Sequence, residues 1–226
     1  LYVMFFGAVQ MGARRWIALG PLNLQPSEFA KVGVALVLAK LFGDENRGSL
    51  SWIDLAIGGA LTCVPLALIA KEPDLGTAVT LLPIFMAVAY LAGLPMRVFG
   101  ILLVCLALAA PLAWKFALKD YQKSRVVTFL DPSQDAKGAG YQQIQARITV
   151  GSGGFFGTGL FNGPQTNGRF VPEQQTDFIF TVAGEETGFL GSLIILGLFG
   201  TVLMRAFSIA RRTNDAFGKL VCVGVI

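Results

Sequence analysis

The chain has 226 residues, of which 54% are hydrophobic and only 14% are charged, with a net charge of +4 and a mean hydropathy of +0.63. Soluble domains carry about 25% charged residues, so this composition excludes an ordinary soluble domain and predicts a membrane protein. The absence of histidine excludes histidine bases, His-ligated zinc and Ser-His-Asp triads from this chain, and the diffuse positive charge argues against nucleic-acid binding.

Both ends of the sequence are apolar. Residues 1–9, LYVMFFGAV, have the composition of the end of an apolar span, and residues 220–226, LVCVGVI, that of the start of another. The first residue is not a methionine. We therefore expect an internal part of a longer protein, with a partial span at each end and a single transmembrane domain over residues 1–226.

Hydropathy predicts the transmembrane spans of an all-α, polytopic helical bundle. The expected spans are 27–43, 54–70, 76–93, 98–117 and 178–204. Pro65, Pro83 and Pro111 lie inside spans and predict kinks, which membrane helices tolerate where neighbours satisfy the backbone.

The orientation of the bundle follows from its Lys and Arg residues. The short loops 40–54, 93–98 and 205–219 carry more of them than the short loops 10–26 and 71–75. The positive-inside rule places the first set in the cytoplasm. The long loop 118–176 is then extracytoplasmic.

Loop 118–176 is too long for a simple connection. Its segment 141–150, YQQIQARITV, has apolar residues at helical spacing and predicts an interfacial amphipathic helix. The following segment 151–159, GSGGFFGTG, lacks the GK[ST] ending of a nucleotide-binding P-loop. A tight turn that allows close backbone approach is the favoured interpretation, although its amides could also contact a lipid diphosphate.

Ionisable side chains at span ends are candidate functional residues, because charge at the membrane is costly. Glu28 and Lys31 share one helical face, where they would form a structural ion pair or bind substrate. Lys71, Glu72 and Asp74 lie at an outer span boundary, as a solvated turn or as part of a site.

Two further groups of charges are candidates. Arg14 and Arg15 could bind a phosphate or a lipid headgroup. Glu185 and Glu186 lie within the last complete span, where we expect partners in the interior of the bundle.

The string PEQQTDFIF, residues 172–180, places Asp177 where the long loop meets an apolar span. Thr176 or Asp177 could simply cap the following helix. Acids, cations and an amphipathic loop converge, however, on the predicted outer face. This combination suits a site for an amphiphilic anionic substrate.

Nearly the whole chain closely resembles the SEDS family (shape, elongation, division, sporulation) of RodA/FtsW-type peptidoglycan polymerases. The matching strings, in order, are GARRWI (12–17), QPSEFAK (25–31), EPDLGTA (72–78), DYQKSRV (120–126), LDP (130–132), GAGYQ (138–142), GSGG (151–154) and PEQQTDFIF. The stretch GLFNGPQTNGRFVPE, residues 159–173, is similar to the RodA branch. Many members have histidine where Gln175 stands here, so the resemblance leaves Asp177 as the catalytic candidate.

The resemblance implies a ten-span bacterial inner-membrane protein that polymerises lipid II during elongation and shape maintenance. It implies Asp177 as catalytic acid/base and possible use of Mg²⁺ or Mn²⁺, although the sequence contains no metal motif. Lys31 would offer a cation to the diphosphate, and Glu28 would orient it. The remaining expected substrate-binding residues are Asp74, Arg14, Arg15 and Glu173. The expected partners are lipid II, membrane lipids and a class B penicillin-binding protein transpeptidase.

Two alternatives stay open at the level of sequence. A lipid II flippase would also need membrane-embedded charges and broken helices. A non-enzymatic scaffold of the cell-wall synthesis complex would need none of these acids.

Overall fold

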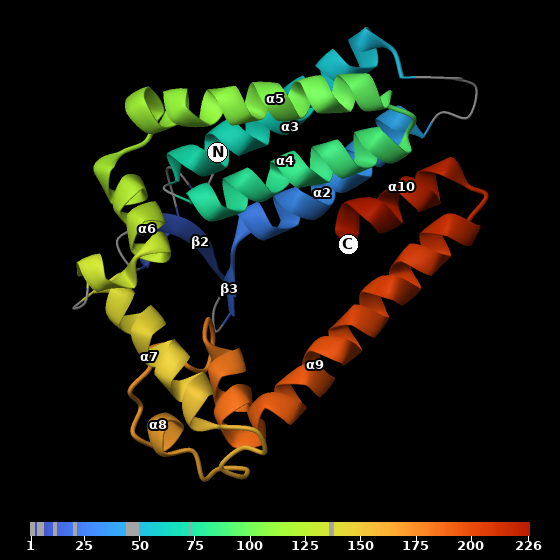
Figure 1. The fold of residues 1–226 in the computed structure, drawn as a ribbon. Coiled ribbons are helices and arrows are strands. Elements are labelled where there is room, and N and C mark those ends of the chain that lie inside the picture. The colour runs from blue at the N-terminus through green and yellow to red at the C-terminus, as the bar shows by residue number, and fades with distance from the viewer. Residues whose placement is uncertain are drawn as a thin grey trace. The chain divides into compact units, whose positions relative to one another are not determined.

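The computed structural model describes residues 3, 7–10, 13–19, 22–43, 50–72, 74–135 and 138–226 (Figure 1). The chain divides into two compact units, which are described one at a time. Unit 1 comprises residues 1–108 and 203–226, and unit 2 comprises residues 109–202.

Unit 1 begins with a small antiparallel sheet that the all-helical expectation did not include. Its strands, in spatial order, are β1 (Ala8–Gln10), β2 (Ala13–Leu19) and β3 (Leu22–Leu24). Gln10 pairs with Ala13, and Leu19 pairs with Leu22. The predicted partial span at residues 1–9 therefore ends in a strand, while residues 1, 2 and 4–6 of it lie outside the described residues.

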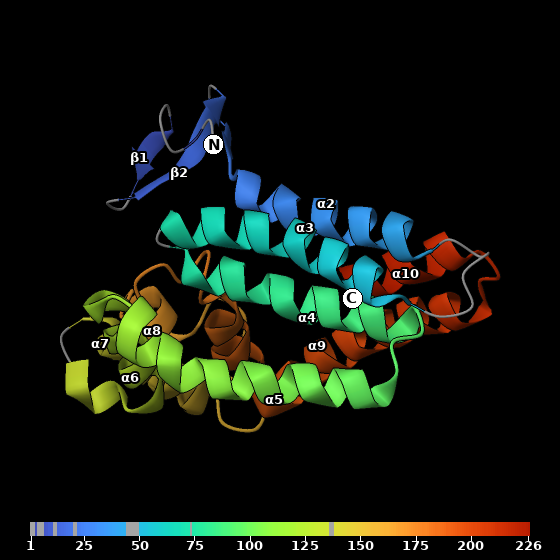
Figure 2. The ribbon, with the colours of Figure 1, turned by 90° about the horizontal axis from the view of Figure 1, so that it is seen from above.

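Helices form the rest of unit 1. They are α2 (Pro26–Phe42), α3 (Trp52–Lys71), α4 (Leu75–Leu91), the first part of α5 (Met96–Leu112), the end of α9 (Ile179–Arg212) and α10 (Ala216–Val225). Helices α2, α3 and α4 run side by side, and α10 packs against α2 and α4 (Figures 1 and 2).

Local sequence sets the ends of these helices, and small residues let them approach. Ser51 starts α3 with a capping box, in which its hydroxyl accepts from the Ile53 amide and the Asp54 carboxylate accepts from the Ser51 amide. A Cβ on Gly224 of α10 would lie 2.8 Å from the Cβ of Ala35. This close packing is typical of helix pairs in membranes. The core holds fully buried apolar residues, among them Leu38, Leu81, Val88 and Leu220.

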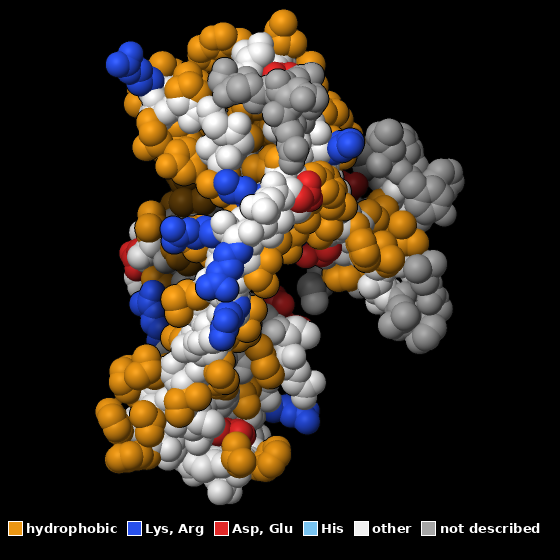
Figure 3. Space-filling view, turned by 90° about the vertical axis from the view of Figure 1, so that its right-hand side faces the viewer, with side chains coloured by type: hydrophobic (Ala, Val, Ile, Leu, Met, Phe, Trp, Pro, Cys, Tyr) orange, Lys and Arg blue, Asp and Glu red, His pale blue; other side chains and the backbone are white. Residues whose placement is uncertain are grey.

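The five predicted spans coincide with α2, α3, α4, α5 and α9. Among the described residues, three helices are long and apolar enough to cross a membrane by length and composition: Trp52–Lys71, Met96–Phe116 and Ile179–Arg212. Helix α5 contains no buried residue. Figure 3 shows one face of the molecule with apolar side chains over much of it. The protein is a multi-pass membrane protein.

Unit 2 shows that the long loop 118–176 is largely helical. After the π-helix Ala113–Ala117, which follows Pro111, come α6 (Asp120–Leu130), the 3₁₀ turn η2 (Pro132–Asp135), α7 (Ala139–Ser152) and α8 (Pro164–Asn167). Helix α7 contains the predicted amphipathic segment 141–150. Gly140 packs α7 onto η2, because a Cβ there would collide with the carbonyl oxygens of Pro132 and Asp135.

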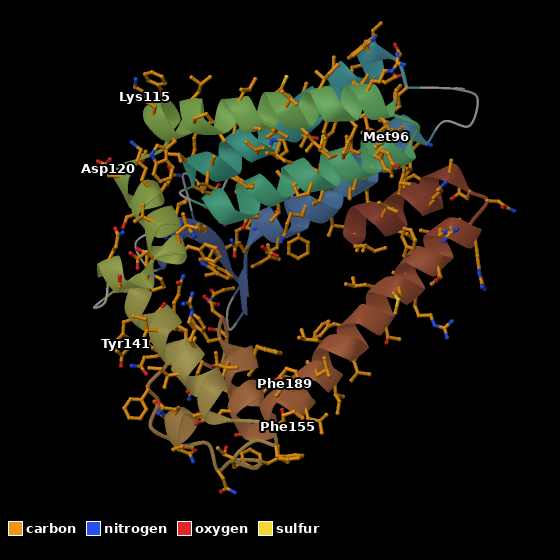
Figure 4. The ribbon with its side chains drawn as sticks, viewed as in Figure 1. Met96, Lys115, Asp120, Tyr141, Phe155 and Phe189 are labelled. Carbon is orange, nitrogen blue, oxygen red and sulfur yellow. The ribbon has the colours of Figure 1, made fainter. Side chains whose placement is uncertain are left out.

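Helix α9 is broken at Gly188, whose φ of 67° and ψ of −164° are not helical. The Gly-rich segment 151–159 lies against this break (Figure 4), where the Phe155 and Phe189 rings have centroids 5.7 Å apart. Four backbone hydrogen bonds join the two segments: Thr158 to Glu185 (3.0 Å), Gly159 to Glu186 (3.1 Å), Phe189 to Gly154 (2.9 Å) and Leu190 to Phe155 (3.2 Å), each written from amide to carbonyl. The predicted close backbone approach is confirmed, and the amides of Thr158 and Gly159 are occupied rather than free for a diphosphate.

Candidate functional site

Asp177 lies in the turn that precedes α9, in unit 2. Its side chain is exposed, and within the described part of the chain no hydrogen bond or ion pair involves its carboxylate. Helix α9 starts at Ile179 without a cap from Asp177 or Thr176, since the Thr176 hydroxyl donates instead to the Glu173 carbonyl at 3.3 Å. The capping alternative is therefore not observed, and Asp177 is a carboxylate with unused hydrogen-bonding capacity.

A polar pocket of about 480 Å³ lies immediately before Asp177 in the chain. Its lining residues are Arg169, Val171, Pro172, Glu173, Gln174, Gln175 and Thr176. Arg169 and Glu173 have φ values of 52° and 54°. Residues other than glycine occupy this left-handed region at a cost, so the backbone of the pocket is strained. Glu173, a predicted substrate-binding residue, is one of its walls.

Glu28 and Lys31 form an ion pair on α2 in unit 1, with 2.8 Å between Lys31 Nζ and Glu28 Oε2. Both line a cavity of about 520 Å³ between α2, α4 and α10. The other lining residues are Val32, Thr80, Pro83, Ile84, Ala87 and Val223–Ile226. A charged pair in the lining of an otherwise mostly apolar cavity suits a ligand that has both a charged and a hydrocarbon part.

Asp74 has a defined structural role at the start of α4. Its Oδ1 accepts a hydrogen bond of 3.2 Å from the Thr77 amide and so caps the helix. Its Oδ2 accepts one of 3.1 Å from Gln25 Nε2. Asp74 is not among the residues that line the cavity of Glu28 and Lys31.

Arg15 lies in β2, and its Nε donates a hydrogen bond of 2.9 Å to the carbonyl oxygen of Glu72. Burial, reinforced by the nearby Asp74 carboxylate, raises the pKa of the Glu72 carboxyl, while Arg15 acts in the opposite direction. Arg14 also lies in β2, but its side chain is outside the described residues.

The predicted site residues therefore form two groups, one in each unit. The group in unit 1 consists of Arg15 in β2, Glu28 and Lys31 in the first two turns of α2, and Asp74 at the start of α4. Glu173 and Asp177 lie four positions apart in unit 2. The expected convergence of Lys31 and Asp74 with Asp177 stays a prediction.

Glu185 is a central residue of unit 2 whose partners sequence reasoning missed. Its carboxylate is fully buried, and it accepts hydrogen bonds from the loop rather than from the bundle interior. The donors are the Ser152 hydroxyl (3.1 Å), the Gln165 amide (2.8 Å), the Thr166 amide (2.8 Å) and the Thr166 hydroxyl (2.6 Å). The only signal in the sequence was a charge inside an apolar segment, which does not reveal the partners.

Among the described residues, no three His, Cys, Asp or Glu side chains gather as an all-protein metal site. Mg²⁺, however, is usually held by one or two carboxylates together with substrate phosphates. Asp177, exposed and without a hydrogen-bond partner among the described residues, fits that mode.

The sequence of all 226 residues matches the model of a family described as cell cycle proteins, named for FtsW, RodA and SpoVE. The chain belongs to this family. Within the FtsW/RodA/SpoVE family it is 41% identical over 222 residues to the peptidoglycan glycosyltransferase MrdB of Escherichia coli, which covers 98% of this chain and 60% of the relative. It is 32% identical over 298 residues to the peptidoglycan glycosyltransferase RodA of Treponema pallidum, covering all of this chain and 68% of that protein.

Solved structures agree with the fold of this family member. A chain from a peptidoglycan synthase complex that coordinates polymerization and crosslinking aligns with a TM-score of 0.78 and 34% identity, over 99% of this chain and 61% of that chain. The rod shape-determining protein RodA of Thermus thermophilus aligns with a TM-score of 0.63 and 29% identity, over 99% of this chain and 56% of that chain. The chain thus spans about 60% of the length of the Escherichia coli relative.

Proposed function

We propose that the protein containing this chain is a peptidoglycan glycosyltransferase that polymerises lipid II into glycan strands during cell elongation. Family membership and relatives named as peptidoglycan glycosyltransferases support this activity. The single observation that carries it is Asp177, an exposed carboxylate with no hydrogen-bond partner among the described residues, beside a polar pocket at the start of an apolar helix.

In the proposed reaction Asp177 acts as the general base. It removes the proton from the 4-hydroxyl of one sugar as that oxygen attacks the anomeric carbon of the lipid-linked sugar. The bond from the anomeric carbon to the diphosphate breaks, and the diphosphate leaves with the electron pair. One carboxylate is sufficient because the diphosphate leaves without protonation, unlike the leaving group in glycoside hydrolysis.

The negative charge of the leaving diphosphate requires a cation nearby. Lys31 is the proposed cation, since it lines a mostly apolar cavity that suits a polyprenyl diphosphate. Its ion pair with Glu28 at 2.8 Å would hold the ammonium in place until the substrate arrives. Arg14, Arg15, Asp74 and Glu173 remain proposed substrate-binding residues.

Mg²⁺ or Mn²⁺ would add positive charge at the diphosphate when bound. Asp177 is the carboxylate that could contribute to holding it. Loop 118–176 is proposed to lie on the extracytoplasmic side of the bacterial inner membrane, where lipid II is presented for polymerisation.

The proposed partner is a class B penicillin-binding protein transpeptidase, which would crosslink the strands that this protein makes. The similar chain from a synthase complex that coordinates polymerization and crosslinking supports such a pairing.

The test is polymerisation of purified lipid II in detergent by the full-length protein and by its Asp177→Ala variant. Loss of a general base should lower turnover by roughly 10²-fold or more. The thermal midpoint should be unchanged, because the carboxylate makes no hydrogen bond among the described residues. Polymer made in detergent cannot arise from flipping alone, so wild-type product excludes both a pure flippase and a scaffold. Near-normal turnover of the variant would remove Asp177 from the mechanism.

A further inference from the structure

We propose that Glu185 is a positioning residue. Its buried carboxylate anchors segment 163–176 of the loop to α9 and thereby sets the position of Asp177. The inference rests on the proposed function, in which Asp177 is the base. Glu185 itself is too enclosed to act on substrate, because its side chain is fully buried and both carboxylate oxygens already accept hydrogen bonds.

The first step of the argument is the strength of the anchor. Oε1 accepts from the Gln165 amide and shares the single Ser152 hydroxyl proton with the Thr149 carbonyl, while Oε2 accepts from the amide and the hydroxyl of Thr166. Hydrogen bonds to a carboxylate are shorter and stronger than neutral ones. A buried charge must also keep its partners, since its solvation by water is lost. The start of α8 is therefore tied to α9 by a group that has no alternative partner.

The second step connects this anchor to loop residues 172–177, which end at Asp177. Gln174 Nε2 donates a hydrogen bond of 3.2 Å to the Thr166 carbonyl, so the residue that contacts Glu185 also holds the PEQQTD string. Val171, between them, is only 2% exposed. From Glu185 to Asp177 the connection is continuous: carboxylate, Thr166, Gln174 and two further residues.

The third step is backbone strain within the anchored segment. Arg169 and Glu173 have φ values of 52° and 54°. Such conformations are unfavourable for residues other than glycine and persist only where surrounding contacts impose them. The Glu185 hydrogen bonds are buried contacts that hold the start of this segment in place.

Gly163 provides an independent sign that the carboxylate and the loop fit closely. A Cβ on Gly163 would collide with Oε2 of Glu185 and lie 2.7 Å from its Cδ. The backbone of Gly163 has φ −66° and ψ 114°, which alanine adopts freely. Alanine at this position would therefore disturb the anchor by displacing the carboxylate and not by straining its own backbone.

The first experiment compares Glu185→Gln with Glu186→Gln in the full-length protein. Glutamine keeps the size of the side chain but turns one acceptor into a donor, which then faces the backbone amide of Gln165 or of Thr166. Glu186 is the matched control, since it is the adjacent acid and no hydrogen bond of its side chain is present among the described residues. Hydrogen exchange of segment 163–176 and the kcat and KM for lipid II are measured, together with the thermal midpoint.

Glu185→Gln should raise amide exchange across 163–176 about tenfold or more, because a hydrogen bond to a charged group contributes roughly that factor to local opening. Turnover should fall at least as much, while KM changes little, because Asp177 acts in the transition state. Glu186→Gln should match wild type in every measurement. A purely structural role would instead lower the thermal midpoint while leaving turnover per folded molecule unchanged, and that result would overturn the proposal.

Gly163→Ala provides the second variant if Glu185→Gln does not fold, with Gly151→Ala as its control, since a Cβ on Gly151 meets nothing within 4 Å. If Gly163→Ala shows the same hydrogen exchange in segment 163–176 and the same turnover as wild type, the proposed anchoring by Glu185 is wrong. If the wild-type protein makes no polymer, the proposed function fails, and exchange alone then decides whether Glu185 holds the segment.

Discussion

Gln25 and Asp74, 49 positions apart in the sequence, are joined by a hydrogen bond of 3.1 Å from Nε2 to Oδ2. The same Gln25 nitrogen also donates to the Ser27 hydroxyl at 2.9 Å. Gln25 is the residue before α2, and Asp74 is the residue before α4. This link fixes the starts of two helices at the same end of unit 1, within about two turns of Glu28 and Lys31. The QPSEFAK and EPDLGTA strings are thus parts of one structural arrangement.

The ion pair of Lys31 should matter more for activity than for stability. Its side chains are 30% (Lys31) and 52% (Glu28) exposed, and pairs of this kind contribute about 0.2–1 kcal/mol to folding. Lys31→Ala should therefore change the free energy of unfolding by no more than that amount. Loss of a cation at the leaving group should lower polymerisation by roughly 10²-fold.

The matched control for this prediction is Lys40→Ala, an exposed lysine in the last turn of the same helix. Turnover of the Lys40 variant should equal that of wild type. Equal losses of activity and stability in Lys31→Ala would favour a structural ion pair and would remove Lys31 from substrate binding.

Glu72 should make the stability of the protein depend on pH. Burial raises the pKa of this carboxyl in the folded state above its ordinary value of 4.5. The folded state therefore binds a proton more readily, so the stability contributed by protonation is full below pH 4.5 and is lost as pH rises through the raised pKa. Glu72→Gln should remove this dependence and be at least as stable as wild type at pH 7. Thermal midpoints measured in detergent from pH 4 to 8 test this, and a less stable variant at pH 7 would contradict it.

Gly188 should be intolerant of a side chain. A Cβ there would collide with the Gly157 amide nitrogen and lie 2.7 Å from the Phe156 carbonyl carbon. The backbone conformation alone costs a residue with a side chain about 1–3 kcal/mol, so Gly188→Ala should lower the thermal midpoint. Gly197→Ala on the same helix meets nothing within 4 Å and should stabilise by about 0.5–1 kcal/mol. Similar thermal midpoints for the two variants would argue against close packing of segment 151–159 on the break at Gly188.

The orientation predicted from Lys and Arg can be tested with single cysteines. In a variant without Cys63, Cys105 and Cys222, Ser124→Cys reports on loop 118–176 and Asn214→Cys on loop 205–219; both positions are exposed. A membrane-impermeant maleimide applied to intact cells should label position 124 and not position 214. The opposite labelling pattern would invert the proposed topology.

The sequence predicted the apolar helices because the length and composition of a span are local properties. It also predicted that the backbone of segment 151–159 closely approaches another element, because clustered glycines lack the side chains that would prevent this. It did not predict the sheet of residues 8–24. Its strands have three to seven residues, and an apolar run of that length does not distinguish a short strand from the end of a helix.

The site was predictable only in part, for a similar reason. Glu28 and Lys31 are three positions apart, so their pairing follows from helical geometry. Glu185 meets donors that lie 19 to 33 positions away. These donors are backbone amides and hydroxyls, which are present almost everywhere in a sequence. Only the folded path of the loop determines which of them reach the carboxylate.

The break in α9 at Gly188, which is covered by residues 154–159, limits which segments can be exchanged between members of this family. The backbone groups that Gly188 leaves unpaired in the helix are satisfied by residues 154–159, and the loop in turn depends on the helix for its own amides and carbonyls. A change that moves either segment therefore breaks backbone hydrogen bonds of the other. A chimera that takes residues 151–190 together from a relative keeps both sides of these contacts. A chimera that takes only the loop, or only the start of the helix, combines two segments from different proteins at this contact.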